Sequence, residues 1–198
     1  MCSSDLVETH GDRTQAANTP LHEIGGQGVF TKEVQQAVLD GRADAAVHSA
    51  KDLPTERPHQ LDIAAIMARR SSTDALIGRR LLDLEDGATV ATGSVRRRAQ
   101  IAEIRPDLNF LELRGNIETR LRKIPDSGSI VMAVSALEVL DLTSHIAEEL
   151  DPAVFVPAVG QGAIAIECRN DSSQVLEALA GINDETTATE VTIERAYL

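Results

Sequence analysis

The chain has 198 residues, enough for one or two compact domains, and 42% of them are hydrophobic, which excludes an intrinsically disordered protein. Its net charge of −12 argues against a general nucleic-acid or anionic-membrane binder, because both kinds of binding need a basic surface. The two cysteines, Cys2 and Cys168, lack metal-ligand spacing, and no hydrophobic run reaches transmembrane length, so we expect a cytoplasmic protein without a metal site.

The first informative stretch runs from a glycine-rich segment at residues 25–28 to a polar tip at residues 48–52. Three glycines in four positions predict a flexible loop or a tight turn. Apolar residues at helical spacing predict a helix over residues 31–40, with Gly41 as its left-handed C-cap. Residues 44–47 form a short apolar run without alternation, which is typical of a parallel strand covered on both faces.

Polar residues follow this strand directly: His48, Ser49, Lys51 and Asp52. Ligands of open α/β sheets bind outside the carboxyl ends of the strands, so this is the usual place for chemistry. An aspartate after a strand is, however, more often a turn or cap residue, and His48 is more often a structural histidine than a base.

The next segments predict a first crossover between domains and a binding turn. Residues 61–67 are an apolar strand, residues 69–74 a polar linker and residues 75–77 another strand. A strand at residues 87–91 leads into Thr92-Gly93-Ser94 and a helix over residues 95–104 that begins with Arg96, Arg97 and Arg98. Amides and hydroxyls at a helix N-terminus, together with guanidinium groups, predict a site for carboxylate or phosphate. The spacing is not that of a P-loop or a dinucleotide fingerprint.

The remaining segments continue the alternation of strands and helices. Strands are predicted over residues 108–113, 130–134 and 163–167, and helices over residues 117–124, 136–142, 174–180 and 185–197. Arg114 follows one strand, and Gln161 lies in a glycine-flanked second crossover at residues 159–162. This order predicts two doubly wound α/β lobes joined by two crossovers, one formed by residues 1–69 and 163–198 and the other by residues 73–157.

Basic residues gather in one window of this acidic chain. Residues 96–123 hold eight basic and four acidic residues, a net charge of +4, which indicates a small polyanionic ligand. Arg98, Arg105, Arg122 and Lys123 are interpreted as solvated helix faces. Arg96 and Arg97 point about 100° apart on a helix and need not both reach one ligand.

Several long motifs, in order, resemble hydroxymethylbilane synthase, also called porphobilinogen deaminase. They are residues 25–33, 40–54, 94–98, 113–121 and 157–169. The resemblance implies two lobes of the periplasmic-binding-protein type. It also implies a transferase that condenses four porphobilinogen units head to tail into hydroxymethylbilane, releasing ammonia, in tetrapyrrole (haem or chlorophyll) biosynthesis.

The resemblance also implies roles for individual residues. Asp52 matches the catalytic aspartate, and Arg96, Arg97, Arg114 and Arg120 match arginines that bind acetate and propionate side chains. The other implied binding residues are Thr92, Ser94, Lys51, Phe30, expected against a pyrrole ring, and Gln161, in the hinge segment.

The family primes its product on a dipyrromethane cofactor that is bound to a cysteine of a third domain. Neither Cys2 nor Cys168 matches this cysteine. The resemblance implies that the first strand and helix of the first lobe and the whole third domain are absent, and we expect the chain alone to be an inactive monomer. Its expected partners are porphobilinogen and the growing oligopyrrole, without nucleic acid or membrane.

A second class of function remains open, that of a non-catalytic two-lobed polycarboxylate-binding module, because a fold does not fix a function. Asp52 separates the two classes, since a binding site for polycarboxylates gains nothing from a carboxylate that faces its ligand.

Overall fold

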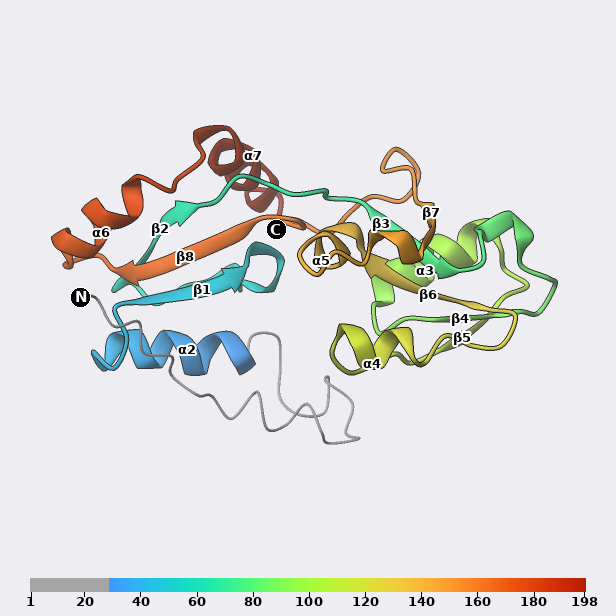
Figure 1. Ribbon diagram of the computed structural model, residues 1–198. Coiled ribbons are helices and arrows are strands. Elements are labelled where there is room, and N and C mark those ends of the chain that lie inside the picture. Colours follow the sequence, from blue (N-terminus) through green and yellow to red (C-terminus); the bar gives the residue numbers. More distant parts are fainter. Residues whose placement is uncertain (1–28) are drawn as a thin grey trace. The chain divides into compact units, whose positions relative to one another are not determined.

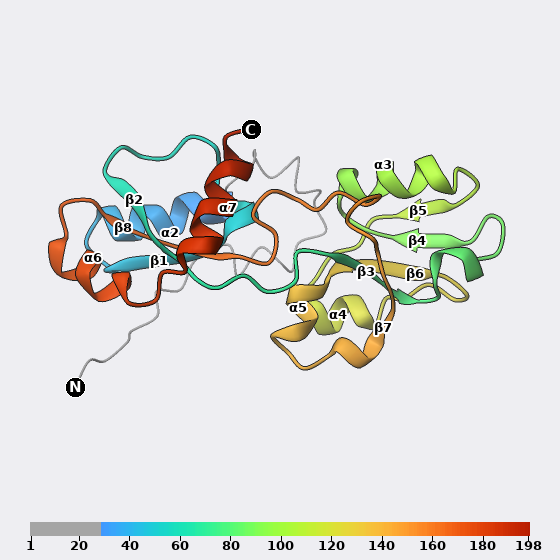
Figure 2. The same ribbon diagram turned by 90° about the horizontal axis from the view of Figure 1, so that it is seen from above.

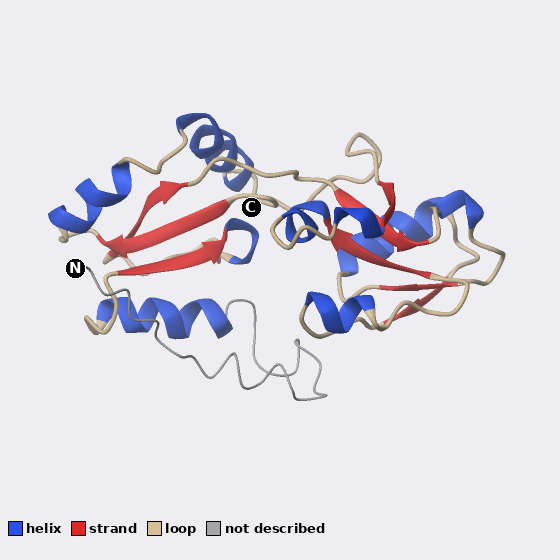
Figure 3. Ribbon diagram, viewed as in Figure 1, coloured by secondary structure: helices blue, strands red, loops and turns tan. Residues whose placement is uncertain are grey.

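The computed structural model describes the backbone of residues 29–198 and the side chains of residues 31–198 (Figure 1). The chain divides into two compact units, which we call lobe 1 (Met1–Arg69 and Ala163–Leu198) and lobe 2 (Arg70–Gly162). The chain therefore crosses between the lobes twice. Each lobe combines a sheet with helices, which confirms the predicted α/β class with two crossovers (Figure 3).

Lobe 1 contains three strands, three α-helices and one short 3-10 helix among its described residues. They are α2 (Val29–Leu39), β1 (Ala45–Ser49), η1 (Ala50–Asp52), β2 (Leu61–Ile66), β8 (Ile164–Arg169), α6 (Ser173–Ala180) and α7 (Glu185–Arg195).

The lobe 1 sheet has the order β1-β8-β2, and β8 runs antiparallel to both neighbours. The prediction of a parallel strand covered on both faces was wrong for residues 44–47. Ala46 and His48 are buried, whereas Val47 is 64% exposed, so β1 alternates between a covered and an open face. The sequence hid this alternation because the exposed position carries valine.

Helices lie on both faces of the lobe 1 sheet: α2 packs on β1 and β8, whereas α6 and α7 pack on β2 and leave β1 open on their side (Figure 1). Val38 of α2 packs with Ala46 and Leu61, and Val191 of α7 packs with Ile66 in a second cluster. Gly41 ends α2 with φ +72°, as the predicted C-cap requires.

Lobe 2 contains five strands, three α-helices and two short 3-10 helices. They are β3 (Asp74–Gly78), η2 (Leu81–Asp83), β4 (Thr89–Ala91), α3 (Val95–Ile104), β5 (Asn109–Leu111), α4 (Ile117–Leu121), β6 (Ser129–Ala133), α5 (Val134–Glu138), η3 (Thr143–His145) and β7 (Ile146–Glu149).

The lobe 2 sheet has the order β5-β4-β6-β3-β7. β4 is parallel to β5 and β6, and β3 is antiparallel to β6 and β7. Leu76 packs with Ile101 of α3, while its neighbour Ile77 packs with Leu137 of α5, so adjacent residues of β3 serve opposite faces (Figure 2). The predicted helix over residues 136–142 begins earlier, at Val134, and β7 was not predicted.

No helix within residues 29–198 combines the length and the apolarity that crossing a bilayer requires.

The two crossing segments lie side by side at the edge of lobe 2. The amide of Arg70 donates to the carbonyl of Gly162 at 3.0 Å. Gly162 has φ +86°, and a Cβ built on it would lie 2.5 Å from the carbonyl oxygen of Ser71 and 2.6 Å from that of Arg70. Both neighbours are backbone atoms, so a side chain at this position forces the crossing segments apart.

We therefore expect Gly162→Ala to lower the free energy of unfolding by about 1–3 kcal/mol, from the positive φ and the close backbone contacts. Gly181→Ala is the matched control, because Gly181 has φ −68° and no atom within 4 Å of its added Cβ. Urea denaturation of both variants measures the difference. Equal stability of the two variants would contradict this role of Gly162.

Candidate functional site

Asp52 occupies the last position of η1, directly after β1, and its side chain is exposed. The hydroxyl of Thr31 on α2 donates to the carbonyl of Asp52 at 3.2 Å. Lys51 is likewise exposed in η1. Phe30 lies in α2, but its side chain falls outside the described part of the chain, as do Cys2 and the glycine segment 25–28. Lobe 1 thus presents Asp52 on a short turn whose backbone is held from another helix.

A buried polar cluster of side chains from α2, β1 and β8 lies just before this turn. Glu167 is fully buried and accepts a hydrogen bond from Nε2 of Gln35 at 2.8 Å. Nε2 of His48 approaches the same carboxylate oxygen at 3.1 Å, outside good hydrogen-bond geometry. Burial favours the neutral acid, but the contacts with His48 and Gln35 outweigh it and lower the pKa of Glu167. His48 is therefore a buried partner of Glu167, in keeping with the structural interpretation of its role.

In lobe 2, the predicted anion-binding turn follows β4. Thr92 is buried, and its hydroxyl accepts from the amide of Ser94 at 3.2 Å. Ser94 is the N-cap of α3, and its hydroxyl accepts from the amide of Arg97 at 3.4 Å. These bonds fix the first turn of α3, from which Arg96 and Arg97 project.

Asp74, the first residue of β3, forms ion pairs with both of these arginines. Its Oδ2 lies 2.7 Å from Nη2 of Arg96, and its Oδ1 lies 2.7 Å from Nη2 and 3.0 Å from Nε of Arg97. Nε2 of Gln161 donates to Oδ1 at 2.9 Å and to the carbonyl of Ser72 at 2.6 Å. Asp74 is 1% exposed and Gln161 is fully buried. One carboxylate thus joins α3 to both crossing segments within lobe 2.

This arrangement distinguishes the two arginines. Burial alone favours the protonated Asp74, but the charges and hydrogen bonds of Arg97 and Arg96 lower its pKa. The side chain of Arg97 is 11% exposed and also donates to the carbonyl of Val131, whereas that of Arg96 is 27% exposed and also donates to the carbonyl of Val156. Two guanidinium groups face one carboxylate, so the cluster keeps a net charge of +1.

The turn after β5 lies against the turn after β4. The amide of Thr92 donates to the carbonyl of Leu111 at 2.9 Å, and a Cβ on Gly93 would lie 3.0 Å from the carbonyl of Leu113. Arg114 in this second turn lies 3.4 Å from the exposed Glu112. Arg120 on α4 donates from Nε to the carbonyl of Gly115 at 2.7 Å. The sheet thus brings Arg114 and Arg120 to the same edge of lobe 2 as Thr92 and Ser94.

The other basic residues of the window have different surroundings. Arg98 stacks over Phe110, with its Cζ 5.4 Å from the ring centroid. Arg105 was predicted to be solvated, but it donates to the carbonyls of Leu81 and Leu84 and pairs with Asp107 at 2.7 Å. That prediction was wrong, because the long side chain of Arg105 reaches the carbonyl groups of η2 and its C-cap.

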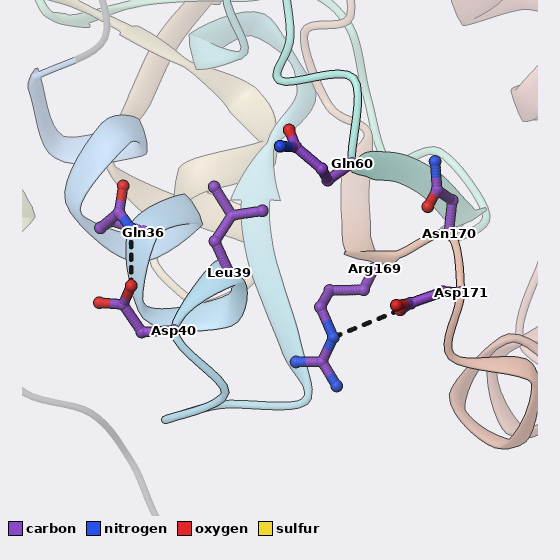
Figure 4. Close-up of a pocket in the computed structure, with 7 residues that line it drawn as sticks. All are labelled: Gln36, Leu39, Asp40, Gln60, Arg169, Asn170 and Asp171. Atoms are coloured by element: carbon purple, nitrogen blue, oxygen red, sulfur yellow. Dashed lines mark hydrogen bonds and ion pairs between the residues drawn. The ribbon is translucent and has the colours of Figure 1, made fainter.

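Figure 4 shows a surface pocket of about 440 Å³ in lobe 1, lined by residues at the end of α2 and by residues 169–171. It lies near the start of β1, since Ala45 pairs with Cys168, whereas Asp52 follows the end of β1. Its lining includes polar side chains that bind one another: Gln36 donates a hydrogen bond to Asp40 at 2.7 Å, and Arg169 forms an ion pair with Asp171 at 3.5 Å. It contains none of the predicted site residues and carries no functional assignment.

Sequence comparisons identify the family to which these features belong. The family model "Porphobilinogen deaminase, dipyromethane cofactor binding domain" matches residues 2–177. The chain belongs to the porphobilinogen deaminase family.

Curated members of this family include the porphobilinogen deaminases of Syntrophotalea carbinolica and Pelobacter propionicus. Each is 43% identical to this chain, over an alignment that covers 97% of this chain. The chain spans 62% and 63% of the length of these two relatives.

Two solved structures have a remote likeness to this chain. A YaeC-family lipoprotein from Enterococcus faecalis V583 is 15% identical, with a TM-score of 0.47 over 81% of this chain and 79% of its own. A Salmonella typhimurium periplasmic binding protein with high arginine specificity is 13% identical, with a TM-score of 0.39 over 82% of this chain and 75% of its own.

Sequence reasoning missed the buried partners of this porphobilinogen deaminase family member. Asp74 was placed at the end of a polar linker, although it begins β3, and Glu167 received no role. The sequence does contain a signal for both residues: each is acidic and lies within an apolar strand, where a buried carboxylate needs a hydrogen-bond or ion-pair partner.

We expect Asp74→Asn to lower the free energy of unfolding by about 3 kcal/mol, because it leaves two guanidinium groups without their carboxylate. Asp107→Asn is the control in the same lobe, where the partner Arg105 keeps its carbonyl contacts. Denaturation at neutral pH compares the two variants. A loss for Asp74→Asn no larger than that for Asp107→Asn would contradict the role of Asp74.

The same substitution should change the pH dependence of stability. A lowered pKa means that Asp74 stabilises the fold fully above its unfolded-state pKa, about 4, and loses this contribution as the pH falls through the folded-state value. The wild type should therefore lose more stability than Asp74→Asn below about pH 4. Parallel curves would exclude a titrating Asp74.

Proposed function

We propose that this chain carries the catalytic carboxylate and the carboxylate-binding arginines of a hydroxymethylbilane synthase, that is, a porphobilinogen deaminase. The reaction joins four porphobilinogen units head to tail into hydroxymethylbilane and releases ammonia, in tetrapyrrole biosynthesis. The observation that carries the proposal is Asp52, an exposed carboxylate on a turn fixed by Thr31, within a sequence 43% identical to the curated deaminases.

Asp52 has the chemistry that this transferase needs. As ammonia leaves the aminomethyl group of porphobilinogen, positive charge develops on the pyrrole. A carboxylate held in a fixed position stabilises this charge without reorganising, and it also accepts or donates protons within hydrogen-bond reach. Lys51, next to it, adds a hydrogen-bond donor on the same turn.

The arginines suit the acetate and propionate groups of porphobilinogen and of the growing oligopyrrole. A guanidinium group is planar and permanently charged, and it matches a carboxylate with two parallel hydrogen bonds. We assign direct binding to Arg96, Arg114 and Arg120, together with the hydroxyl of Ser94. The side chain of Arg97 is less exposed than that of Arg96 and makes two bonds to Asp74 where Arg96 makes one, so we assign Arg97 a supporting role.

The family cofactor, dipyrromethane, fits this chain in part. When bound, it supplies the pyrrole to which the first porphobilinogen is joined. Its carboxylate groups match Arg96, Arg114 and Arg120. Cys168 is fully buried and its pKa is raised, first by burial, so it is no candidate for the attachment thiol. We further propose that the 198 residues alone form no product. We expect them to be a monomer in the cytosol, with lobe boundaries near residues 69 and 163.

The alternative, a polycarboxylate-binding module without catalysis, accounts for the arginines alone. It gives no use to Asp52, because an exposed carboxylate near the ligand repels other carboxylates. The enzyme is therefore the better proposal.

In a version extended to the length of the curated relatives, we expect Asp52→Ala to lower the turnover of porphobilinogen by at least about 100-fold, while the carboxylate-bearing substrate still binds. The loss follows from the missing charge stabilisation, whereas the arginine contacts remain. Asp62→Ala, an exposed position on β2 of the same lobe, is the control. Turnover of Asp52→Ala close to that of the control would remove Asp52 from the mechanism.

A further inference from the structure

Three successive carbonyl groups at the tip of lobe 1 each accept a hydrogen bond from a distant side chain. Thr31 of α2 donates to the carbonyl of Asp52 at 3.2 Å. Arg195 of α7 donates from Nη1 to the carbonyl of Leu53 at 3.2 Å and from Nη2 to that of Pro54 at 2.7 Å. Surface turns are usually the least constrained part of a fold. This one is held from two helices at the position of the exposed carboxylate.

Helix α7 contacts this turn in two ways. Val191 is buried and packs in the cluster that contains Leu53 and Ala50. Arg195 follows one turn later, on the same face of α7, because residues four positions apart are neighbours on a helix. Val191 thus belongs to the buried cluster that contains Leu53, and Arg195 binds the carbonyl groups of Leu53 and Pro54.

The guanidinium group of Arg195 is charged and partly buried, and its recorded hydrogen-bond acceptors are these two carbonyl groups. Burial lowers its pKa first and nearby Arg57 lowers it further, while Glu167 acts in the opposite direction. Among residues 31–198, the structure records no carboxylate within ion-pair distance of Arg195.

Arg69 is a second arginine that contacts α7, and its partners differ from those of Arg195. Arg69 pairs with Glu190 at 3.4 Å and with Glu194, and these ion pairs hold α7 to the segment that follows β2. A half-buried guanidinium group costs free energy unless its donors find acceptors, and for Arg195 the turn after Asp52 supplies two of them.

We propose that Arg195 is a positioning residue for Asp52: it fixes the backbone that follows the carboxylate by binding the carbonyl groups of Leu53 and Pro54. The inference rests on the proposed catalytic role of Asp52. The proposal gives α7 an indirect role in the positioning of Asp52, although no side chain of α7 is assigned to contact substrate. Hydrogen bonds from a charged donor to two consecutive carbonyl groups restrict rotation of the segment, and this preorganises the carboxylate.

The first test uses the 198-residue chain itself and needs no activity. Amide hydrogen exchange of residues 50–56 is compared in the wild type, Arg195→Gln, Arg195→Lys and Arg69→Gln. We expect exchange at these residues to rise about tenfold or more in Arg195→Gln. Arg195→Lys should lie between it and the wild type, because one ammonium cannot reproduce the guanidinium fork. Arg69→Gln should affect α7 and leave residues 50–56 close to the wild type.

The second test uses a version extended to the length of the curated relatives. We expect Arg195→Gln to lower kcat for porphobilinogen by about 10- to 100-fold with little change in KM, since the loss falls on the positioning of Asp52. Arg195→Lys should recover part of kcat. A purely structural role would instead lower the amount of folded enzyme in both Arg195→Gln and Arg69→Gln, with kcat per folded molecule unchanged.

The outcomes separate this inference from the proposed function. Exchange of residues 50–56 that is unaltered in both Arg195 variants would overturn the positioning role, whatever the activity. Normal kcat in the Arg195 variants, together with an inactive Asp52→Ala, would overturn it while leaving the proposed function intact. Full activity of Asp52→Ala would instead remove the proposed function. If Arg195→Gln does not fold, Arg195→Lys carries both measurements.

Discussion

A carboxylate stays ionised in a protein interior only when positive groups and hydrogen-bond donors surround it, and Asp74 meets this requirement with Arg96, Arg97 and Gln161. The consequences extend through lobe 2. The first turn of α3 is fixed relative to β3, and the two crossing segments are joined through the bonds of Gln161 to Asp74 and to the carbonyl of Ser72. Because two arginines share one carboxylate, the cluster remains net positive. That excess charge lies beside Thr92 and Ser94, where the proposed carboxylate ligands would bind.

Both lobes hold their candidate binding groups in the same manner. In each, a charged side chain projects from a turn or from the first turn of a helix, and other polar side chains bind the backbone there. In lobe 1, Thr31 and Arg195 bind the carbonyl groups of residues 52–54. In lobe 2, Ser94 binds the first turn of α3. In lobe 1 these contacts are separate from the side chain of Asp52, whereas in lobe 2 Ser94 both caps α3 and belongs to the proposed binding residues.

Local pattern was enough to predict most of the fold, including α3 over residues 95–104, β2, and the α/β class with two crossovers. The open face of β1 was not predictable, because valine at the exposed position 47 removed the alternation that marks a half-covered strand, and its antiparallel direction follows from pairing with the distant strand β8. Strand β7 was missed because Glu148 and Glu149 lower the apolar content of a four-residue strand. The site residues Asp52, Arg96 and Arg114 came from motifs, whereas the partners Asp74 and Arg195 depend on contacts across many residues of sequence. Such contacts leave no local period in the sequence.

The central claim is that the arginines at the edge of lobe 2 bind carboxylates, with Arg114 in direct contact. The most direct measurement is isothermal titration of porphobilinogen into the 198-residue chain, at about 0.05 M and about 0.5 M salt. We expect affinity to fall as salt rises, and Arg114→Ala to weaken binding about tenfold or more at low salt. Arg98→Ala, which removes the same charge from the Phe110 side of α3, should bind like the wild type. Binding that is insensitive to salt, or equal in the Arg114→Ala and Arg98→Ala variants, would contradict the claim.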